Sequence, residues 1–273
     1  MIVVYLLVAV LLIFCTVIVH EYGHLRSCRR HGIAVEEFSF GVGKTLKTWT
    51  TKKGLKVNWK LLPVGGSVSP AGMTVEEVEE KALPKETSYI YASPIARFRI
   101  TAAGIGYNVL FAMLLQVFII PVILKPATWS EWAAIPGTIF WATLVILGAF
   151  IGLIVQAPLT GFSEVNSVIK LPEGLENTVN LGSEQGLSIF MVLALAWMSL
   201  NLFMAILNAL PIYPLDGFFL ATSVMDWARK RIHGDDYSPL PYSRLEKWAR
   251  AGFVSLLTLA LFLIVRDVVR MIY

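Results

Sequence analysis

Five apolar stretches divide the sequence, and they constrain its fold more than any other feature. They run from Ile2 to Val19, Ile100 to Leu124, Ala133 to Ala157, Leu187 to Leu210 and Gly252 to Val265. A helix needs about 20 predominantly apolar residues to cross the hydrocarbon layer of a bilayer, and most of these stretches are long enough. The chain is 56% hydrophobic and only 15% charged, whereas soluble domains carry about 25% charged residues. These features predict an all-α polytopic membrane protein with four to six transmembrane helices.

Basic residues concentrate in two of the connections between these stretches, and this predicts the orientation of the chain. One basic connection separates the first two stretches, and the other lies between Arg229 and Arg250. The connection from Thr160 to Gly186 instead carries four glutamates and one lysine. Because basic loops stay cytoplasmic, we expect an integral protein of the cell membrane with its amino terminus outside. The basic residues form no aromatic-interleaved patch, so the net charge of +4 does not indicate nucleic-acid binding.

The segment after the first apolar stretch differs in kind from the helices. Glycine and proline punctuate it at 41–43 and 63–66, and residues 56–61 alternate between polar and apolar side chains. These patterns are typical of short strands and turns, and they predict a small β-hairpin or sheet associated with the membrane. The charged run from Val75 to Lys81 predicts a short solvated helix.

The first apolar stretch leads into the sequence His-Glu-Tyr-Gly-His at residues 20–24. It lacks the basic start and the small-residue cleavage site of a signal peptide, so we expect a retained helix. Positions i and i+4 share one helix face, so His20 and His24 can bind one zinc ion, with Glu21 beside them as general base. Alternatively, the two histidines only cap the helix as it leaves the bilayer. His20 lies roughly 27 Å along the helix, near the cytoplasmic edge of the hydrocarbon layer.

A catalytic zinc ion usually has three protein ligands, so this motif leaves one ligand to be found. Asp216 is the strongest candidate among the five aspartates, because it follows an apolar stretch that Pro211 and Pro214 interrupt. Irregular backbone and an ionisable side chain at membrane depth indicate a cavity and a functional site. The other aspartates are expected to be solvated or paired charges: Asp226, Asp235, Asp236 and Asp267.

Several motifs, in the same order, resemble those of the site-2 proteases, a family of intramembrane zinc metalloproteases. The segment from His20 to His24 is similar to the start of that family's first motif block. Asn208 to Pro211 and Leu215 to Gly217 are similar to its last block. Leu61 to Gly66 and Ala102 to Asn108 also match family motifs.

The resemblance implies a metal site and a catalytic residue. His20, His24 and Asp216 would bind a single Zn²⁺ ion, and Glu21 would be the general base. The PDZ domain that some members insert before the last motif block is missing, and the third apolar stretch occupies its place. Regulation known from members with a PDZ domain therefore does not carry over.

The resemblance also implies residues that bind the substrate. Asn208 and Asn201 match family asparagines, of which the one nearer to the aspartate motif is associated with holding the substrate backbone. Hydrogen bonding between helices is the alternative role for both side chains. Val64, Gly65 and Gly66 lie in a segment that resembles a membrane-facing β element, which receives an unwound substrate as an added strand.

The third apolar stretch, from Ala133 to Ala157, determines whether both halves of the zinc site lie on the same side of the membrane. The span that ends near Asp216 has to begin outside, and a single crossing by the third stretch would place its start inside. We therefore expect an even number of crossings, as a re-entrant or surface-lying helix pair broken near Gly148 or Gly152. Three aromatic side chains would lie near the interface: Trp129, Trp132 and Trp141.

These expectations divide the chain into consecutive segments. They are a first transmembrane helix with the zinc motif (1–30), a cytoplasmic-side β element and charged loop (31–97), a second transmembrane helix (98–125), an apolar segment with an external loop (126–186), a transmembrane segment with the Asp-Gly motif (187–225), a basic cytoplasmic loop (226–249) and a C-terminal transmembrane helix (250–273).

The expected activity is hydrolysis of peptide bonds within or near transmembrane segments of membrane proteins, as in regulated intramembrane proteolysis. A catalytically inactive relative, or a membrane transporter or binding protein with a metal site, is the alternative. The expected partners are a transmembrane protein substrate and the lipid bilayer, with no nucleic acid.

Overall fold

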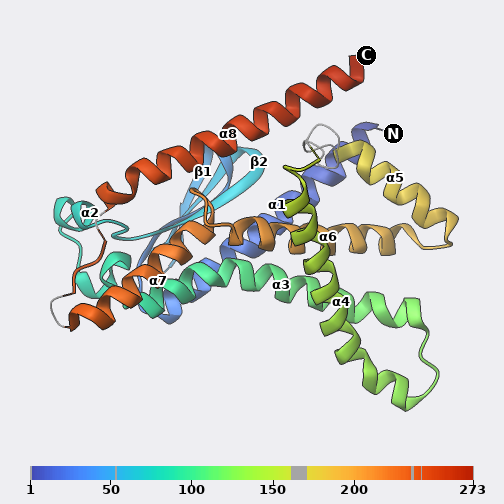
Figure 1. Cartoon of the computed structure of the whole chain (residues 1–273), viewed down its shortest axis with the longest axis horizontal. Coiled ribbons are helices and arrows are strands. Elements are labelled where there is room, and N and C mark those ends of the chain that lie inside the picture. Colours follow the sequence, from blue (N-terminus) through green and yellow to red (C-terminus); the bar gives the residue numbers. More distant parts are fainter. Residues whose placement is uncertain (1, 53, 161–170, 235–236, 241, 273) are drawn as a thin grey trace. The chain divides into compact units, whose positions relative to one another are not determined.

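The computed structural model describes residues 2–52, 54–160, 171–234, 237–240 and 242–272 of the chain. Within these residues, most of the chain is helical and one β-sheet follows the first helix (Figure 1). The chain forms two compact units. The first comprises residues 1–16, 108–206 and 256–273, and the second comprises residues 17–107 and 207–255.

Five helices of the described residues are long and apolar enough to cross a membrane. They are α1 (Ile2–Arg30), α3 (Pro94–Leu124), α4 (Trp129–Gln156), α6 (Ile189–Ala209) and α8 (Tyr242–Ile272). The remaining helices are α2 (Val75–Glu80), α5 (Leu171–Glu184) and α7 (Asp216–His233), with two 3₁₀ turns, η1 (Lys85–Thr87) and η2 (Tyr89–Tyr91). The prediction of an all-α polytopic membrane protein with a small β element is confirmed.

The core of the first unit is formed by apolar side chains where α3, α4 and α6 pack together. Ala112 and Ile119 of α3 are buried against Met198 and Leu202 of α6. A polar contact is buried between α3 and α4, where Gln116 Nε2 donates to Thr143 Oγ1 at 2.7 Å. Small and polar residues at such contacts are typical of helices that associate within a membrane.

Helix α4 shows that the predicted break near Gly148 or Gly152 is wrong. Residues Trp129 to Gln156 form one continuous helix, drawn as an unbroken ribbon in Figure 1. A capping box between Thr128 and Glu131 begins it. Within an apolar stretch the backbone has no competing hydrogen-bond partner, so a single glycine keeps its helical bonds. The predicted even number of crossings remains a prediction.

The β-sheet of the second unit pairs β1 (Val35–Thr50) with β2 (Lys56–Pro70) in antiparallel register. Phe38 pairs with both Val68 and Val57, so the first part of β1 has partners on both of its edges. Gly41, with a φ of +83°, lies at a register shift in β1. The side chain of Phe38 is buried against Leu25 of α1, which fixes the sheet to that helix.

The far part of the β-hairpin exposes large apolar side chains. They are Leu46, Trp49, Trp59, Leu61 and Leu62, each at least 40% exposed. A cluster of exposed tryptophan and leucine side chains is typical of a surface that contacts a membrane or another apolar surface. This exposure agrees with the expected association of the hairpin with the membrane.

The range 226–249, predicted as a basic cytoplasmic loop, is mostly helical in its described residues. Helix α7 continues to His233 and ends at Gly234, whose φ is +58°, and α8 begins at Tyr242. Asp235 and Asp236 lie outside the described residues. Asp226 and Asp267 are paired, as predicted, but both are buried, with relative exposures of 1% and 0%.

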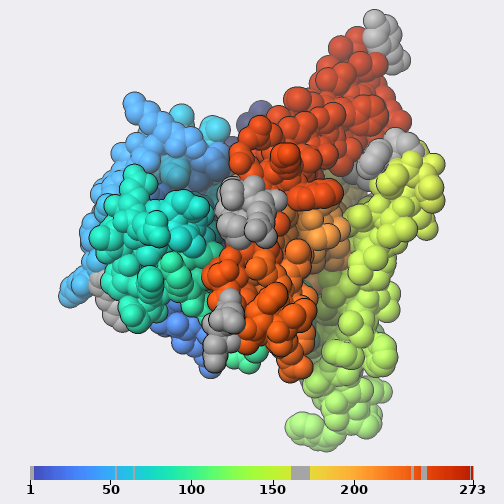
Figure 2. Space-filling view, turned by 60° about the vertical axis from the view of Figure 1, so that its left-hand side comes forward, coloured from blue at the N-terminus to red at the C-terminus, as the bar shows by residue number. Residues whose placement is uncertain are grey.

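Asp226 belongs to a buried polar network that joins the start of α3 to α7. Arg97 Nη2 donates to Asp226 Oδ2 at 2.7 Å and to the Tyr237 hydroxyl at 2.9 Å, and the Leu240 backbone N–H donates to Asp226 Oδ1 at 3.1 Å. Burial raises the pKa of Tyr237, so its hydroxyl stays protonated. Figure 2 shows α2, in teal, beside α7, in orange. Residues of both helices line a small cavity together with Arg97.

We expect Asp226→Ala to destabilise the protein by about 3–5 kcal/mol, because it leaves the Arg97 charge buried without a partner. The double variant Arg97→Met/Asp226→Leu should recover most of this loss, since a buried ion pair is often replaceable by apolar groups. Unfolding in a denaturing detergent measures both effects. Glu246→Ala is the matched control, because the pair of Glu246 with Arg250 is exposed and such pairs contribute about 0–1 kcal/mol. Equal losses in Asp226→Ala and Glu246→Ala would contradict the assigned role of the network.

Candidate metal centre

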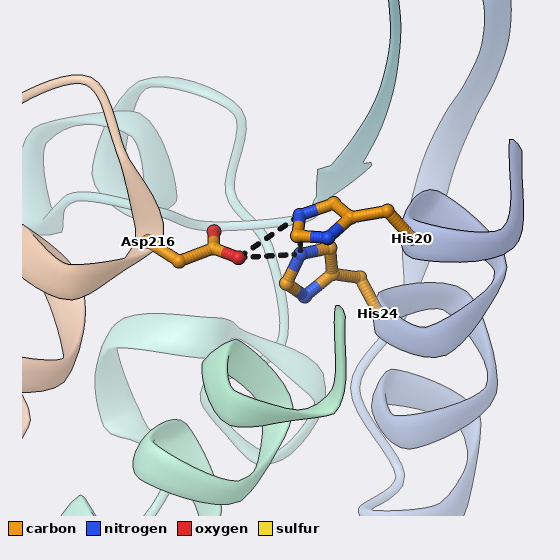
Figure 3. A group of neighbouring side chains, drawn as sticks. All are labelled: His20, His24 and Asp216. Carbon is orange, nitrogen blue, oxygen red and sulfur yellow. Dashed lines mark hydrogen bonds and ion pairs between the residues drawn. The ribbon is translucent and has the colours of Figure 1, made fainter. Parts of the chain in front are cut away.

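Three side chains from distant parts of the sequence meet in the second unit (Figure 3). His20 Nε2 lies 3.0 Å from Asp216 Oδ2, His24 Nε2 lies 3.1 Å from the same oxygen, and the two Nε2 atoms are 3.1 Å apart. All three side chains are at most 17% exposed. The structure therefore brings together the three residues that the sequence predicted as metal ligands.

The secondary structure explains how each ligand is positioned. His20 and His24 are one turn apart on α1 and point to the same side of it (Figure 3). Asp216 is the first residue of α7, directly after the turn that follows α6. A Cβ atom on Gly217 would overlap the carbonyl oxygens of Ala209 and Leu210. The Asp-Gly sequence is thus explained by a close backbone approach that places Asp216 beside the end of α6.

Two glycines allow α1 and α3 to approach closely at the level of the histidines. A Cβ atom on Gly23 would lie 2.6 Å from the Ala103 carbonyl oxygen. A Cβ atom on Gly104 would lie 2.7 Å from His20 Cε1 and nearer still to His24 Nε2. Gly104 therefore belongs to the site. The sequence analysis did not identify its contact with the histidines, because no local pattern shows which helix packs against which.

The orientation of the His24 ring is fixed by a backbone carbonyl on α3. His24 Nδ1 lies 2.9 Å from the Ile100 oxygen. Because a carbonyl oxygen only accepts, Nδ1 carries a proton, and in the neutral ring this leaves the Nε2 lone pair to face Asp216 and His20. Metal-binding histidines usually have such a second partner, which holds both the tautomer and the ring orientation.

The donor set fits a zinc ion better than it fits a network of hydrogen bonds. Asp216 Oδ2 is buried, and it accepts no hydrogen bond of good geometry within the described residues, although two ring nitrogens lie within 3.1 Å of it. Ligand atoms in a tetrahedral zinc site are about 3.3 Å apart, close to the three separations found here. Two imidazoles and a carboxylate also match the ligand types of catalytic zinc, which leaves one position open.

A cavity of about 200 Å³ adjoins two of the three candidate ligands, His24 and Asp216. His24, Asp216 and Glu21 line one part of it, and Ser67, Val68 and Pro70 of β2 line another. The Glu21 carboxyl group lies next to the backbone of Val68. The carboxylate next to the ligands thus faces the same space as the last part of β2.

The remaining predicted site residues are less directly connected to the ligands. Asn201 is fully buried in the first unit, where its Nδ2 donates to the Trp197 carbonyl oxygen at 2.8 Å. Asn208 is partly buried near the end of α6 and is not among the described residues that line the cavity. The roles of both asparagines in substrate binding remain predictions.

The predicted substrate strand lies in β2, next to Glu21. A Cβ atom on Gly66 would lie 3.3 Å from Glu21 Cγ and 3.2 Å from Val17 Cγ1, so this strand passes directly against α1. Gly65 lies one residue earlier with a φ of +88°. The side chain of Val64 lies outside the described residues.

Several helices could span a membrane, and α1 carries a His-Glu-x-x-His motif whose histidines meet a distant aspartate. Together, these two features define the class of membrane metalloproteases. The family model for peptidase family M50 matches residues 8–258. The chain therefore belongs to peptidase family M50, the site-2 protease family, and is an integral membrane protein.

Individual relatives agree with this assignment. A Helicobacter pylori protein named "Putative zinc metalloprotease" is 39% identical over 115 residues, which is 41% of this chain and 32% of that protein. Protease RseP of Yersinia pestis is 38% identical over 106 residues, which is 38% of this chain and 23% of that protein. The match therefore spans a third or less of the length of these curated relatives.

Proposed function

We propose that this protein is an intramembrane zinc metalloprotease, which hydrolyses peptide bonds within or near transmembrane segments of other membrane proteins. One observation carries the proposal: His20, His24 and Asp216 converge within 3.1 Å, and Glu21 lines the same cavity. A transporter or a binding protein would need the metal ligands but not a carboxylate placed to move a proton. The names of the relatives, which include a zinc metalloprotease and a protease, support the same activity.

Metal binding and proton transfer are carried out by different residues of the site. His20, His24 and Asp216 would hold one zinc ion, which when bound polarises a carbonyl group and lowers the pKa of water. Glu21 accepts the proton of the attacking water as general base and then delivers it to the leaving amine as general acid. The Ile100 carbonyl oxygen keeps His24 in the ligating tautomer, and Gly104 leaves room for both rings.

The substrate would bind in an extended form along β2. A helical substrate hides its carbonyl groups in its own hydrogen bonds, so it must be unwound before hydrolysis. Ser67, Val68 and Pro70 line the cavity beside Glu21, so a strand added to this part of β2 would pass the catalytic group. Gly66 contributes by having no side chain between β2 and Glu21.

The depth of the site follows from the position of the motif on α1. The apolar run from Ile2 to Val19 precedes the ligands, and at 1.5 Å per residue it spans roughly 27 Å. With the amino terminus outside, the zinc ligands would lie near the cytoplasmic side of the cell membrane.

Purified protein should contain one zinc ion per chain and cleave a subset of single-span membrane proteins. Zinc is measured by elemental analysis, and cleavage is measured on substrates with and without a glycine pair in the transmembrane helix. Because glycine weakens a helix, the glycine-containing substrates should be cleaved faster. Removal of zinc with 1,10-phenanthroline should abolish cleavage, and added zinc should restore it.

Cleavage that persists in zinc-free protein would contradict the proposed mechanism. Full zinc occupancy without cleavage of any substrate in the panel would favour an inactive relative or a binding protein. Equal cleavage of the substrates with and without glycine would contradict only the extended mode of substrate binding.

A further inference from the structure

The end of α1 carries a basic face that the proposed catalytic site does not use. Tyr22, Leu25, Arg26, Arg29 and Arg30 line an open hollow of about 380 Å³. Their spacing of i, i+3, i+4, i+7 and i+8 places all five on one side of the helix. At 100° per residue, this side is about opposite to that of His20 and His24. The hollow is therefore a separate surface on the back of the zinc-binding helix.

The three arginines of this face lack acidic partners within the described part of the chain. None of the ion pairs found there includes Arg26, Arg29 or Arg30. Arg26, Arg29 and Arg30 are exposed. Positive charge at a helix C-terminus is favourable for the helix dipole, but that effect does not require three such side chains around one hollow. Three unpaired guanidinium groups around one hollow indicate an anionic ligand, and a phosphate group matches their fork geometry.

The position of the face along the helix indicates where such a phosphate would come from. Helix α1 has 29 residues, whereas about 20 are enough to cross the hydrocarbon layer. Its last turns, after Tyr22, therefore reach the headgroup region. The exposed side chains of the face change in the same direction, from the aromatic Tyr22 at the membrane end to Arg29 and Arg30 at the outer end. A phospholipid has the same order, with its acyl and glycerol part below its phosphate.

We propose that this hollow is a binding site for the headgroup of an anionic phospholipid. The arginines hold the phosphate, while Tyr22, which is 46% exposed, contacts the glycerol and the upper acyl chains. An acidic segment of a protein would match the arginines but not the exposed aromatic ring of Tyr22 at the membrane end of the face. The site does not depend on the proposed activity, because it lies on the side of α1 away from the ligands.

Native mass spectrometry of the purified full chain tests the site with two lipids, phosphatidylglycerol and phosphatidylcholine. The wild type should bind one phosphatidylglycerol at least about tenfold more tightly than phosphatidylcholine. Arg26→Gln/Arg29→Gln/Arg30→Gln should lose this preference, because each basic residue near a lipid headgroup contributes to binding. Lys44→Gln/Lys47→Gln/Lys52→Gln removes the same charge from the exposed hairpin and should keep the preference.

A second variant covers the case in which the glutamine protein fails to insert, because arginines next to a helix also set its orientation. Arg26→Lys/Arg29→Lys/Arg30→Lys keeps the charge and removes the forked donors, so it should bind phosphatidylglycerol about threefold to tenfold less tightly than the wild type. Unchanged lipid preference in both arginine variants, or equal loss in the hairpin variant, would overturn the proposal. So would complete displacement of the lipid by millimolar inorganic phosphate or by an acidic peptide.

Discussion

Glu21→Gln should leave one zinc ion per chain and reduce peptide hydrolysis by about 10²–10⁴-fold, the usual contribution of general acid–base catalysis. The glutamine side chain has almost the same shape as glutamate, so it fits between α1 and β2 and can still contact Val68. It cannot accept a proton from water or return one to the leaving amine. Zinc analysis and the initial rate of cleavage measure the two effects separately.

Glu80→Gln is the matched control for this variant. Glu80 is exposed at the end of α2, so its substitution changes the same charge without touching the cavity. A Glu21→Gln protein that cleaves at the wild-type rate would eliminate Glu21 as the general base. Loss of zinc in Glu21→Gln would instead show that the carboxylate supports the metal site.

Gly104→Ala should abolish both zinc binding and hydrolysis. The added methyl group would lie 2.7 Å from His20 Cε1 and nearer to His24 Nε2, whereas carbon atoms in contact are about 3.5–4.0 Å apart. His24 cannot rotate away without losing its bond to the Ile100 oxygen. Either α1 and α3 separate or the rings leave the ligating position, and in both cases the three donor atoms no longer converge.

Gly106→Ala is the control for this substitution, because nothing lies within 4 Å of the position its Cβ would take. Both variants gain the higher helix propensity of alanine, about 1 kcal/mol, so a difference between them reports only the contact with the histidines. Zinc content per chain and cleavage rate are the measurements. Normal zinc content in Gly104→Ala would contradict the close packing of α3 on the metal ligands.

The zinc motif was predictable because it is local. Two histidines four residues apart lie on one face of any helix, and a charge-free run before them predicts that helix. Asp216 could be found because prolines interrupt an apolar stretch just before it, and the resemblance to the site-2 proteases agreed. The structure adds that Gly217 permits the close turn at this position.

The contacts between distant segments were not predictable in the same way. The Ile100 carbonyl oxygen and Gly104 act on the histidines from 76 or more residues away, and no periodicity in one helix identifies its neighbour. The break expected in α4 was wrong because glycine weakens a helix in water more than in an apolar environment. Asp226 was predicted as a solvated or paired charge, and its burial depends on Arg97, 129 residues away.

The tight contact of Gly104 with both imidazole rings also bears on how quickly the protein can exchange its metal. An ion held on an open helix surface can leave as soon as one histidine swings out. Here the rings are enclosed by the backbone of a second helix, and one is tethered to it by the Ile100 carbonyl oxygen. The rings therefore cannot move toward α3, and we expect a bound ion to exchange more slowly here than on an open helix surface.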